Sequence, residues 1–155
     1  MRKVLIAIDY SPAAQKVAEM GYALGKAMQA EIVLLHVMEE EHYYASTIYD
    51  PIMGFGGFVN INLLSRDTAN YIVHGAEMFL NKTKQHLADN NIKTMVLHGN
   101  ISETIIETAH KEKCQLIVMG THSRNMVEEI LLGSTANKLV RHSPIPLYII
   151  PVKVN

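Results

Sequence analysis

The stretch from Leu116 to Val140 reads LIVMGTHSRNMVEEILLGSTANKLV. Its first four residues are apolar and stand between polar flanks, which is typical of a central strand in a parallel sheet. Gly120 ends this strand, and Gly133 comes just before a helix for which we expect Ser134 to be the N-cap residue. A helix start carries unpaired N–H groups and a partial positive charge. We therefore expect this strand, loop and helix start to hold the phosphates of a nucleotide.

Strand and helix patterns alternate along the rest of the chain. Short apolar runs predict strands over residues 3–8, 31–37, 93–98, 115–119 and 146–154. Helical spacing and cap signals, with Ser11 and Asn100 as two N-cap residues, predict helices over residues 13–29, 65–89, 100–113 and 134–142. This order predicts an α/β fold: an open, mostly parallel five-stranded sheet with helices on both faces, of the Rossmann-like kind. Pro146 and Pro151 lack N–H donors, so the last strand is expected at an edge.

The ends of three predicted strands mark the expected binding site. In open α/β sheets, ligands bind beyond the carboxyl ends of the strands, where the strand order reverses. The first, second and fourth strands end at Asp9, Val37 and Met119-Gly120. Asp9 also fits a purely local role, as a turn acid that accepts hydrogen bonds from nearby backbone N–H groups.

The segment 39–64 interrupts the alternation. It contains Asp50-Pro51 and Gly54-Phe55-Gly56-Gly57-Phe58, which break regular structure. Its tyrosines and phenylalanines make it too aromatic for a simple solvated linker. Two roles stay open for this insertion: a loop that packs over the domain or on a partner subunit, and a lid over a ligand.

Length and composition exclude several classes of protein. A chain of 155 residues suits one domain, 1–155, and its net charge of -1 offers no overall basic surface for nucleic acid. No apolar run reaches the roughly 18–20 residues that span a bilayer, and we expect no signal peptide because the chain goes directly into a strand pattern. A single cysteine, Cys114, excludes an intramolecular disulfide. We expect a cytoplasmic protein with no nucleic acid or membrane partner.

Most motifs of catalysis are absent. The eight histidines form no H-E-x-x-H or Cys/His cluster, so no metal site built by the protein is expected. The chain has no Walker lysine, no G-x-S-x-G elbow and no G-x-G-x-x-G fingerprint. Without an evident general base for a γ-phosphate, rapid ATP hydrolysis is not expected, and no catalytic residue is assigned. Arg124 fits either a phosphate contact or an ordinary solvent-facing position.

The spacing of the loop resembles a known signature. Gly120, two residues, Ser123, nine residues and Gly133-Ser134 resemble the G-x2-G-x9-G-[S/T] pattern of the ATP-binding branch of the universal stress protein family. The second glycine of that pattern is Ser123 here. The stretches VLIAIDYS at 4–11, LLHV at 34–37 and SPIPLYII at 143–150 are similar to the family's first, second and last strands. The likeness covers nearly the whole chain.

The resemblance implies a fold of the adenine nucleotide alpha hydrolase-like type that binds ATP, ADP or AMP, with or without Mg²⁺. The residues that it places at the nucleotide are Ala7, Asp9, Val37, Met119, Gly120, His122, Ser123, Arg124, Gly133, Ser134 and Thr135. It also implies a homodimer through the last strand and a stress-response or signalling role with slow or no ATP hydrolysis. Two alternatives stay open: a nucleotide-free dimeric interaction module of the same fold, and a small-molecule transferase that uses the same adenine site.

Overall fold

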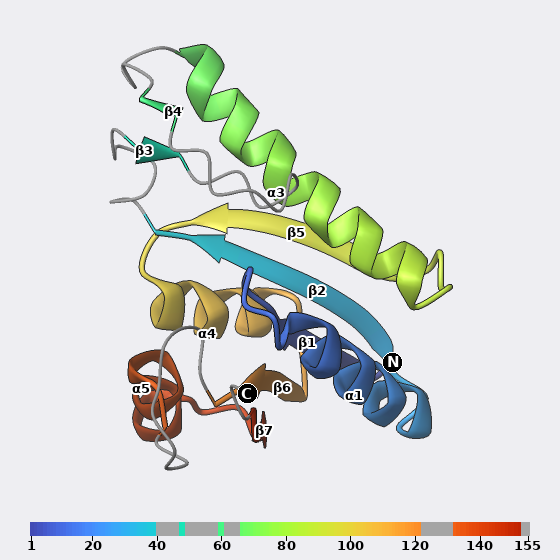
Figure 1. Cartoon of the computed structure of the whole chain (residues 1–155). Coiled ribbons are helices and arrows are strands. Elements are labelled where there is room, and N and C mark those ends of the chain that lie inside the picture. The colour runs from blue at the N-terminus through green and yellow to red at the C-terminus, as the bar shows by residue number, and fades with distance from the viewer. Residues whose placement is uncertain (40–46, 49–58, 61–65, 122–131, 153–155) are drawn as a thin grey trace.

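The computed structural model describes residues 1–39, 47–48, 59–60, 66–121 and 132–152 (Figure 1). The strands are β1 (Lys3–Ala7), β2 (Glu31–Met38), β3 (Thr47–Ile48), β4 (Val59–Asn60), β5 (Lys93–His98), β6 (Leu116–Gly120) and β7 (Leu147–Ile150). The helices are α1 (Ala14–Ala27), α3 (Arg66–His86), α4 (Ile101–Lys111) and α5 (Ser134–His142). The predicted alternation of strands and helices is confirmed, and β5 has the predicted bounds.

Five strands form one parallel sheet in the order β5-β2-β1-β6-β7. The central strand β1 pairs on both sides, so that Leu5 lies opposite Val33 of β2 and Ile117 of β6. The chain first builds the sheet outward from β1 to β5 and then returns to the other side of β1. The strand order therefore reverses between β1 and β6. The edge position predicted for the last strand is confirmed.

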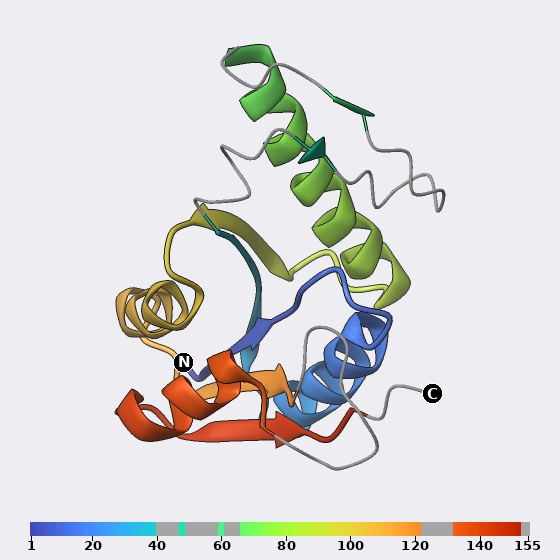
Figure 2. The same ribbon diagram turned by 60° about the vertical axis from the view of Figure 1, so that its left-hand side comes forward.

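Helices cover both faces of the sheet, as predicted (Figure 2). Side chains alternate between the faces along each strand. Val4 and Ile6 of β1 belong to a core shared with α1 and α3, whereas Leu5 belongs to a second core shared with α4 and α5. All three side chains are fully buried. The middle of β1 is apolar on both faces because each face is covered.

Helix α1 packs closely on the sheet because two glycines lie on its buried face. A Cβ atom added at Gly21 would lie 2.9 Å from Cδ1 of Ile6, and one at Gly25 would lie 2.1 Å from Cδ1 of Ile32. Both isoleucines are buried. Glycine is unfavourable within a helix, so these positions exchange helix propensity for close contact between α1 and the strands.

We predict opposite effects for alanine at two helical glycines. Gly25→Ala should lower the free energy of unfolding by about 1 kcal/mol, because the overpacking against Ile32 exceeds the gain in helix propensity. Gly75 of α3 has nothing within 4 Å of an added Cβ atom. Gly75→Ala, the matched control, should therefore raise that free energy by roughly 0.5–1 kcal/mol. Urea unfolding of both variants measures the difference, and a Gly25→Ala protein as stable as Gly75→Ala would contradict the close packing.

The insertion 39–64 contains a short regular element. Thr47 pairs with Asn60 and Ile48 with Val59, so β3 and β4 form a two-stranded antiparallel sheet. Both strands lie outside Asp50-Pro51 and residues 54–58, the motifs expected to break regular structure. Residues 40–46, 49–58 and 61–65 lie outside the described part of the chain. Neither role considered for the insertion is tested.

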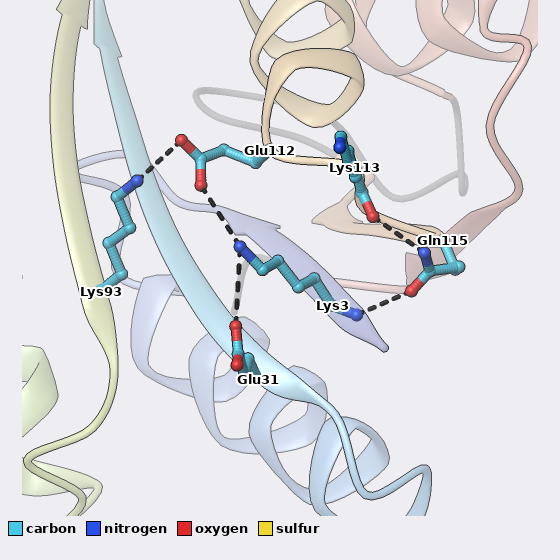
Figure 3. Close-up of polar contacts among 6 residues, drawn as sticks. All are labelled: Lys3, Glu31, Lys93, Glu112, Lys113 and Gln115. Carbon is cyan, nitrogen blue, oxygen red and sulfur yellow. Dashed lines mark hydrogen bonds and ion pairs between the residues drawn. The ribbon is translucent and has the colours of Figure 1, made fainter. Parts of the chain in front are cut away.

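A network of charged side chains ties the amino ends of three strands to the end of α4 (Figure 3). Glu112, the C-cap residue of α4, contacts Nζ of Lys93 on β5 at 2.7 Å and Nζ of Lys3 on β1 at 3.8 Å. Lys3 Nζ also lies 3.6 Å from Glu31 of β2. The hydrogen bond from Lys93 holds the pKa of Glu112 below its ordinary value. Solvent-exposed pairs of this kind contribute little stability, and the relative positions of these strands are set by their backbone pairing.

Candidate functional site

A cleft opens at the carboxyl ends of β1, β2 and β6, beside the start of α5. It has about 710 Å³ of empty space, counting the open solvent at its mouth. The predicted site residues that line it are Ala7, Asp9, Val37, Met119, Gly120, Gly133, Ser134 and Thr135. The structure thus brings together residues more than 120 positions apart in the sequence. His122, Ser123 and Arg124 lie outside the described residues.

Other lining residues were not predicted for the site. They are Ile8, Ser11, Ala14, Val17, Leu35, Ile101, Ile105, Thr121 and Ala136. Those of α4, Ile101 and Ile105, belong to no motif and reach the cleft only through packing of α4 on the sheet. Thr121 did carry a signal, because a polar residue directly after a buried strand of a parallel sheet stands at the ligand-binding edge.

One wall of the cleft is apolar. Leu35 and Met119 come from the ends of β2 and β6, and Ile105 comes from α4. All three side chains are buried. A concave apolar surface beside a few polar groups is the usual form of a site for a small organic ligand. This wall suits a flat, largely apolar ring.

The start of α5 supplies the polar side of the cleft. The N-cap residue is Gly133, with φ -59° and ψ 164°, and the prediction of Ser134 as N-cap was wrong by one residue. The helix begins earlier because the Gly133 carbonyl already accepts the N–H of Asn137 at 2.9 Å. The N–H groups of Ser134, Thr135 and Ala136 precede this first intrahelical bond. Within the described chain nothing accepts from them, so they are available to an anion.

Asp9 takes the local role that the sequence allowed and also lines the cleft. Its Oδ1 accepts the N–H of Ser11 at 3.0 Å. The expectation that Ser11 caps α1 was wrong, because the N-cap residue is Ala13 and its side chain makes no cap hydrogen bond. The Asp9 turn adds a further turn, in which Ala14 N–H donates to Ser11 O at 3.0 Å, before α1 begins. Ser11 lies at the cleft instead.

A buried histidine holds the Asp9 turn from the opposite face of the sheet. Nδ1 of His36 lies 2.9 Å from the carbonyl of Ile8, which can only accept, so Nδ1 carries the proton. The His36 ring lies 4.5 Å from the ring of Tyr10, which in turn lies 4.9 Å from the ring of Phe79 on α3. Burial raises the pKa of Tyr10 to about 12, so its hydroxyl stays neutral. Asp9 therefore stands between two anchored neighbours in the sequence.

Protonation of His36 should weaken the fold. Burial lowers the pKa of His36, although its hydrogen bond to Ile8 and the charge of Asp9 oppose this shift. Below the ordinary histidine pKa of 6.5 the unfolded chain binds a proton that the folded chain does not, so stability falls as pH falls. The slope from this group is at most about 1.4 kcal/mol per pH unit.

We predict that His36→Asn flattens this dependence, because asparagine supplies a neutral N–H donor that does not titrate. Urea unfolding between pH 7.5 and pH 5.5 measures the slope for wild type and variant. His110→Asn, at an exposed position of α4, is the matched control and should keep the wild-type slope. Equal slopes for His36→Asn and wild type would show that protonation of His36 does not contribute to the pH dependence of the free energy of unfolding.

Comparison with known proteins assigns the family. The profile described as Universal stress protein family matches residues 1–151. The chain belongs to the universal stress protein family. The universal stress protein MJ0577 of Methanocaldococcus jannaschii is 25% identical over 155 residues, which cover 98% of this chain and 96% of MJ0577. The family resemblance noted in the sequence is thus confirmed.

Solved structures share the fold of this universal stress protein. The structure of the hypothetical protein MJ0577 matches with a TM-score of 0.74 at 24% identity, covering 99% of this chain and 98% of that one. A universal stress protein solved in complex with cAMP matches with a TM-score of 0.63 at 15% identity, covering 97% and 96%. These likenesses confirm the α/β fold.

Two further features concern only the described residues. Among them no group of three or more His, Cys, Asp or Glu side chains is placed to hold a metal ion. None of the helices described here is long and apolar enough to cross a membrane.

Proposed function

We propose that this universal stress protein binds an adenine nucleotide, namely ATP, ADP or AMP, in the cleft at the carboxyl ends of β1, β2 and β6. One observation carries the proposal: the residues of the apolar wall and the first residues of α5, whose N–H groups have no acceptor within the described part of the chain, line the same cleft. A base requires a concave apolar surface, and phosphates favour the N–H groups and partial positive charge of a helix start. A member of the same fold family was solved with cAMP, an adenine nucleotide, which supports this choice of ligand.

Each side of the cleft receives a role in this proposal. Ala7 and Val37 contact the adenine through backbone groups and apolar surface, and Met119 forms a wall of its slot. Asp9 binds the ribose. The phosphates lie against Gly120, Gly133, Ser134 and Thr135, and His122, Ser123 and Arg124 complete that part of the site. A Mg²⁺ ion, where present, is held mainly by the phosphates.

The proposed role is binding with slow or no hydrolysis. Among the described residues that line the cleft, Asp9 supplies the carboxylate, and its Oδ1 already accepts a hydrogen bond from Ser11 N–H. A carboxylate used to build a turn is poorly suited to activate a water molecule. We therefore propose a cytoplasmic protein with a stress-response or signalling role that binds the nucleotide and hydrolyses it slowly or not at all.

Nucleotide binding predicts a thermal shift. Saturation with ATP and Mg²⁺ at about 100 times the dissociation constant should stabilise the protein by ~2.7 kcal/mol, which raises Tm by roughly 5–10 °C. Gly133→Val should abolish the shift, because the branched side chain fills the space beside the helix start. Valine tolerates the observed φ of -59° and ψ of 164°, so the variant should still fold.

Gly75→Val, at an open position of α3, is the matched control and should keep the full shift. Isothermal titration with ATP measures the affinity of all three proteins. A wild-type protein with no shift at millimolar ATP would favour the nucleotide-free interaction module instead.

We also propose that the protein forms a homodimer through β7. This strand lies at the sheet edge. Ile150 O accepts from Thr121 N–H at 3.0 Å, so the backbone groups of its neighbour Ile149 point away from the sheet. An open apolar edge invites another strand, and pairing with its own copy across a two-fold axis satisfies it.

Ile149→Pro should convert the dimer to a monomer, because it removes an outward N–H donor. An edge strand tolerates proline where the N–H faces away from the sheet, so the monomer should stay folded. Light scattering after size exclusion gives the mass, and circular dichroism verifies the fold. Ile149→Val keeps the N–H and should remain dimeric; a folded dimer of Ile149→Pro would count against pairing through β7.

A further inference from the structure

Thr121 lies between the edge strand and the cleft and is hydrogen-bonded to three other residues of the described part of the chain. Its N–H donates to Ile150 O at 3.0 Å, and its carbonyl accepts the N–H of Gly133 at 2.8 Å. Its side-chain Oγ1 accepts the N–H of Val152 at 3.0 Å. The residue is only 5% exposed. A single residue thus joins the end of β6, the exit of β7 and the cap of α5.

The hydrogen bond of Val152 N–H differs from the one that a parallel ladder predicts. When Thr121 donates to Ile150 O, the next ladder bond should run from Val152 N–H to the carbonyl of Thr121. That carbonyl is already bonded to Gly133 instead, and the hydroxyl of Thr121 accepts from Val152 in its place. A residue without a side-chain acceptor could satisfy only one of these two N–H groups without sharing.

The two residues after β7, Pro151 and Val152, are also fixed by contacts within the protein. Pro151 has no N–H, and its carbonyl accepts from Nζ of Lys16 on α1 at 3.0 Å. Val152 follows directly and is half-buried against the core shared with α1 and α3. Its part-buried N–H donates to the hydroxyl of Thr121 within the protein.

We propose that Thr121 is a positioning residue of the cleft. Its hydroxyl takes the ladder place of its own carbonyl, which leaves the carbonyl to hold Gly133 and, with it, the first N–H groups of α5. This inference rests on the proposed nucleotide function, because it assigns Thr121 to the positioning of the phosphate-binding groups. The hydroxyl acts on the ligand through Gly133.

Two substitutions at Thr121 separate the hydroxyl from the rest of the side chain. Thr121→Val keeps the shape and removes the hydroxyl acceptor, so the Thr121 carbonyl must either accept from both Val152 and Gly133, with poorer geometry for each, or lose one of them. Thr121→Ser keeps the hydroxyl and loses a methyl group. Thr108→Val is the matched control, because Thr108 is also buried but its hydroxyl bonds only within α4, to Thr104 O at 2.6 Å.

The first measurement needs no nucleotide. Amide hydrogen exchange at Gly133 should become about tenfold faster in Thr121→Val, the effect expected from loss of one hydrogen bond. Thr121→Ser and Thr108→Val should stay within about threefold of wild type on the same grounds. An unchanged rate at Gly133 in Thr121→Val would overturn the proposal.

The second measurement is the affinity for ATP with Mg²⁺ by titration calorimetry, with Tm recorded for each protein. Thr121→Val should bind about tenfold more weakly, while Thr121→Ser and Thr108→Val bind within about twofold of wild type whatever their Tm. A Thr121→Val protein with lowered Tm and wild-type affinity would show a purely structural role and overturn the proposal. If wild type binds no ATP, the proposed function fails, and exchange at Gly133 still decides whether Thr121 holds the cap.

Discussion

Parallel pairing of β1 with β2 on one side and β6 on the other is the constraint on which the rest of the structure depends. It places the carboxyl ends of these strands at one edge of the sheet, so that Asp9, Val37 and Gly120 line one cleft. It also places their amino ends together, where Lys3 and Glu112 belong to a polar network. Because all strands run parallel, one edge of the sheet holds only amino ends and the opposite edge only carboxyl ends. The polar network therefore lies at one edge and the cleft at the other. The apolar strands between them are covered on both faces, and the cleft opens at the edge where they end.

The sequence predicted the strands well because their signal is local. A buried strand must be apolar on both faces, and the run from Leu116 to Met119 of β6 follows from that alone. Asn100 was also identified correctly as an N-cap, since its side chain accepts from Glu103 N–H three residues later, at 3.2 Å. Ser11 and Ser134 look equally suitable in the sequence but cap nothing. Contacts with Asp9 and Thr121 decide the chain path at those two helix starts, and sequence patterns do not report such contacts.

The lining of the cleft divides in the same way. Residues at strand ends, such as Ala7 and Met119, follow from the topology of a parallel sheet together with the family pattern. Ile101 and Ile105 reach the cleft because α4 packs across the sheet, and their spacing is that of any amphipathic helix. Whether these residues contact a nucleotide stays a prediction. Local sequence patterns predict which residues lie at strand ends. The cleft residues contributed by a helix such as α4 can be identified only once the packing of that helix on the sheet is known.

Separate hydrogen bonds hold the Asp9 turn and the start of α5, which line two sides of the cleft. On one side, His36 bonds the carbonyl of Ile8, next to Asp9. On the other, the carbonyl of Thr121 bonds the N–H of Gly133 at the start of α5. Both holding residues are buried, and both bonds are made between groups of the protein itself. A ligand that meets groups already in place loses less free energy to ordering the protein. His36 and Thr121 are polar residues at buried positions because each satisfies a backbone group near the ends of the strands. His36 bonds the carbonyl of Ile8, and the hydroxyl of Thr121 accepts the N–H of Val152.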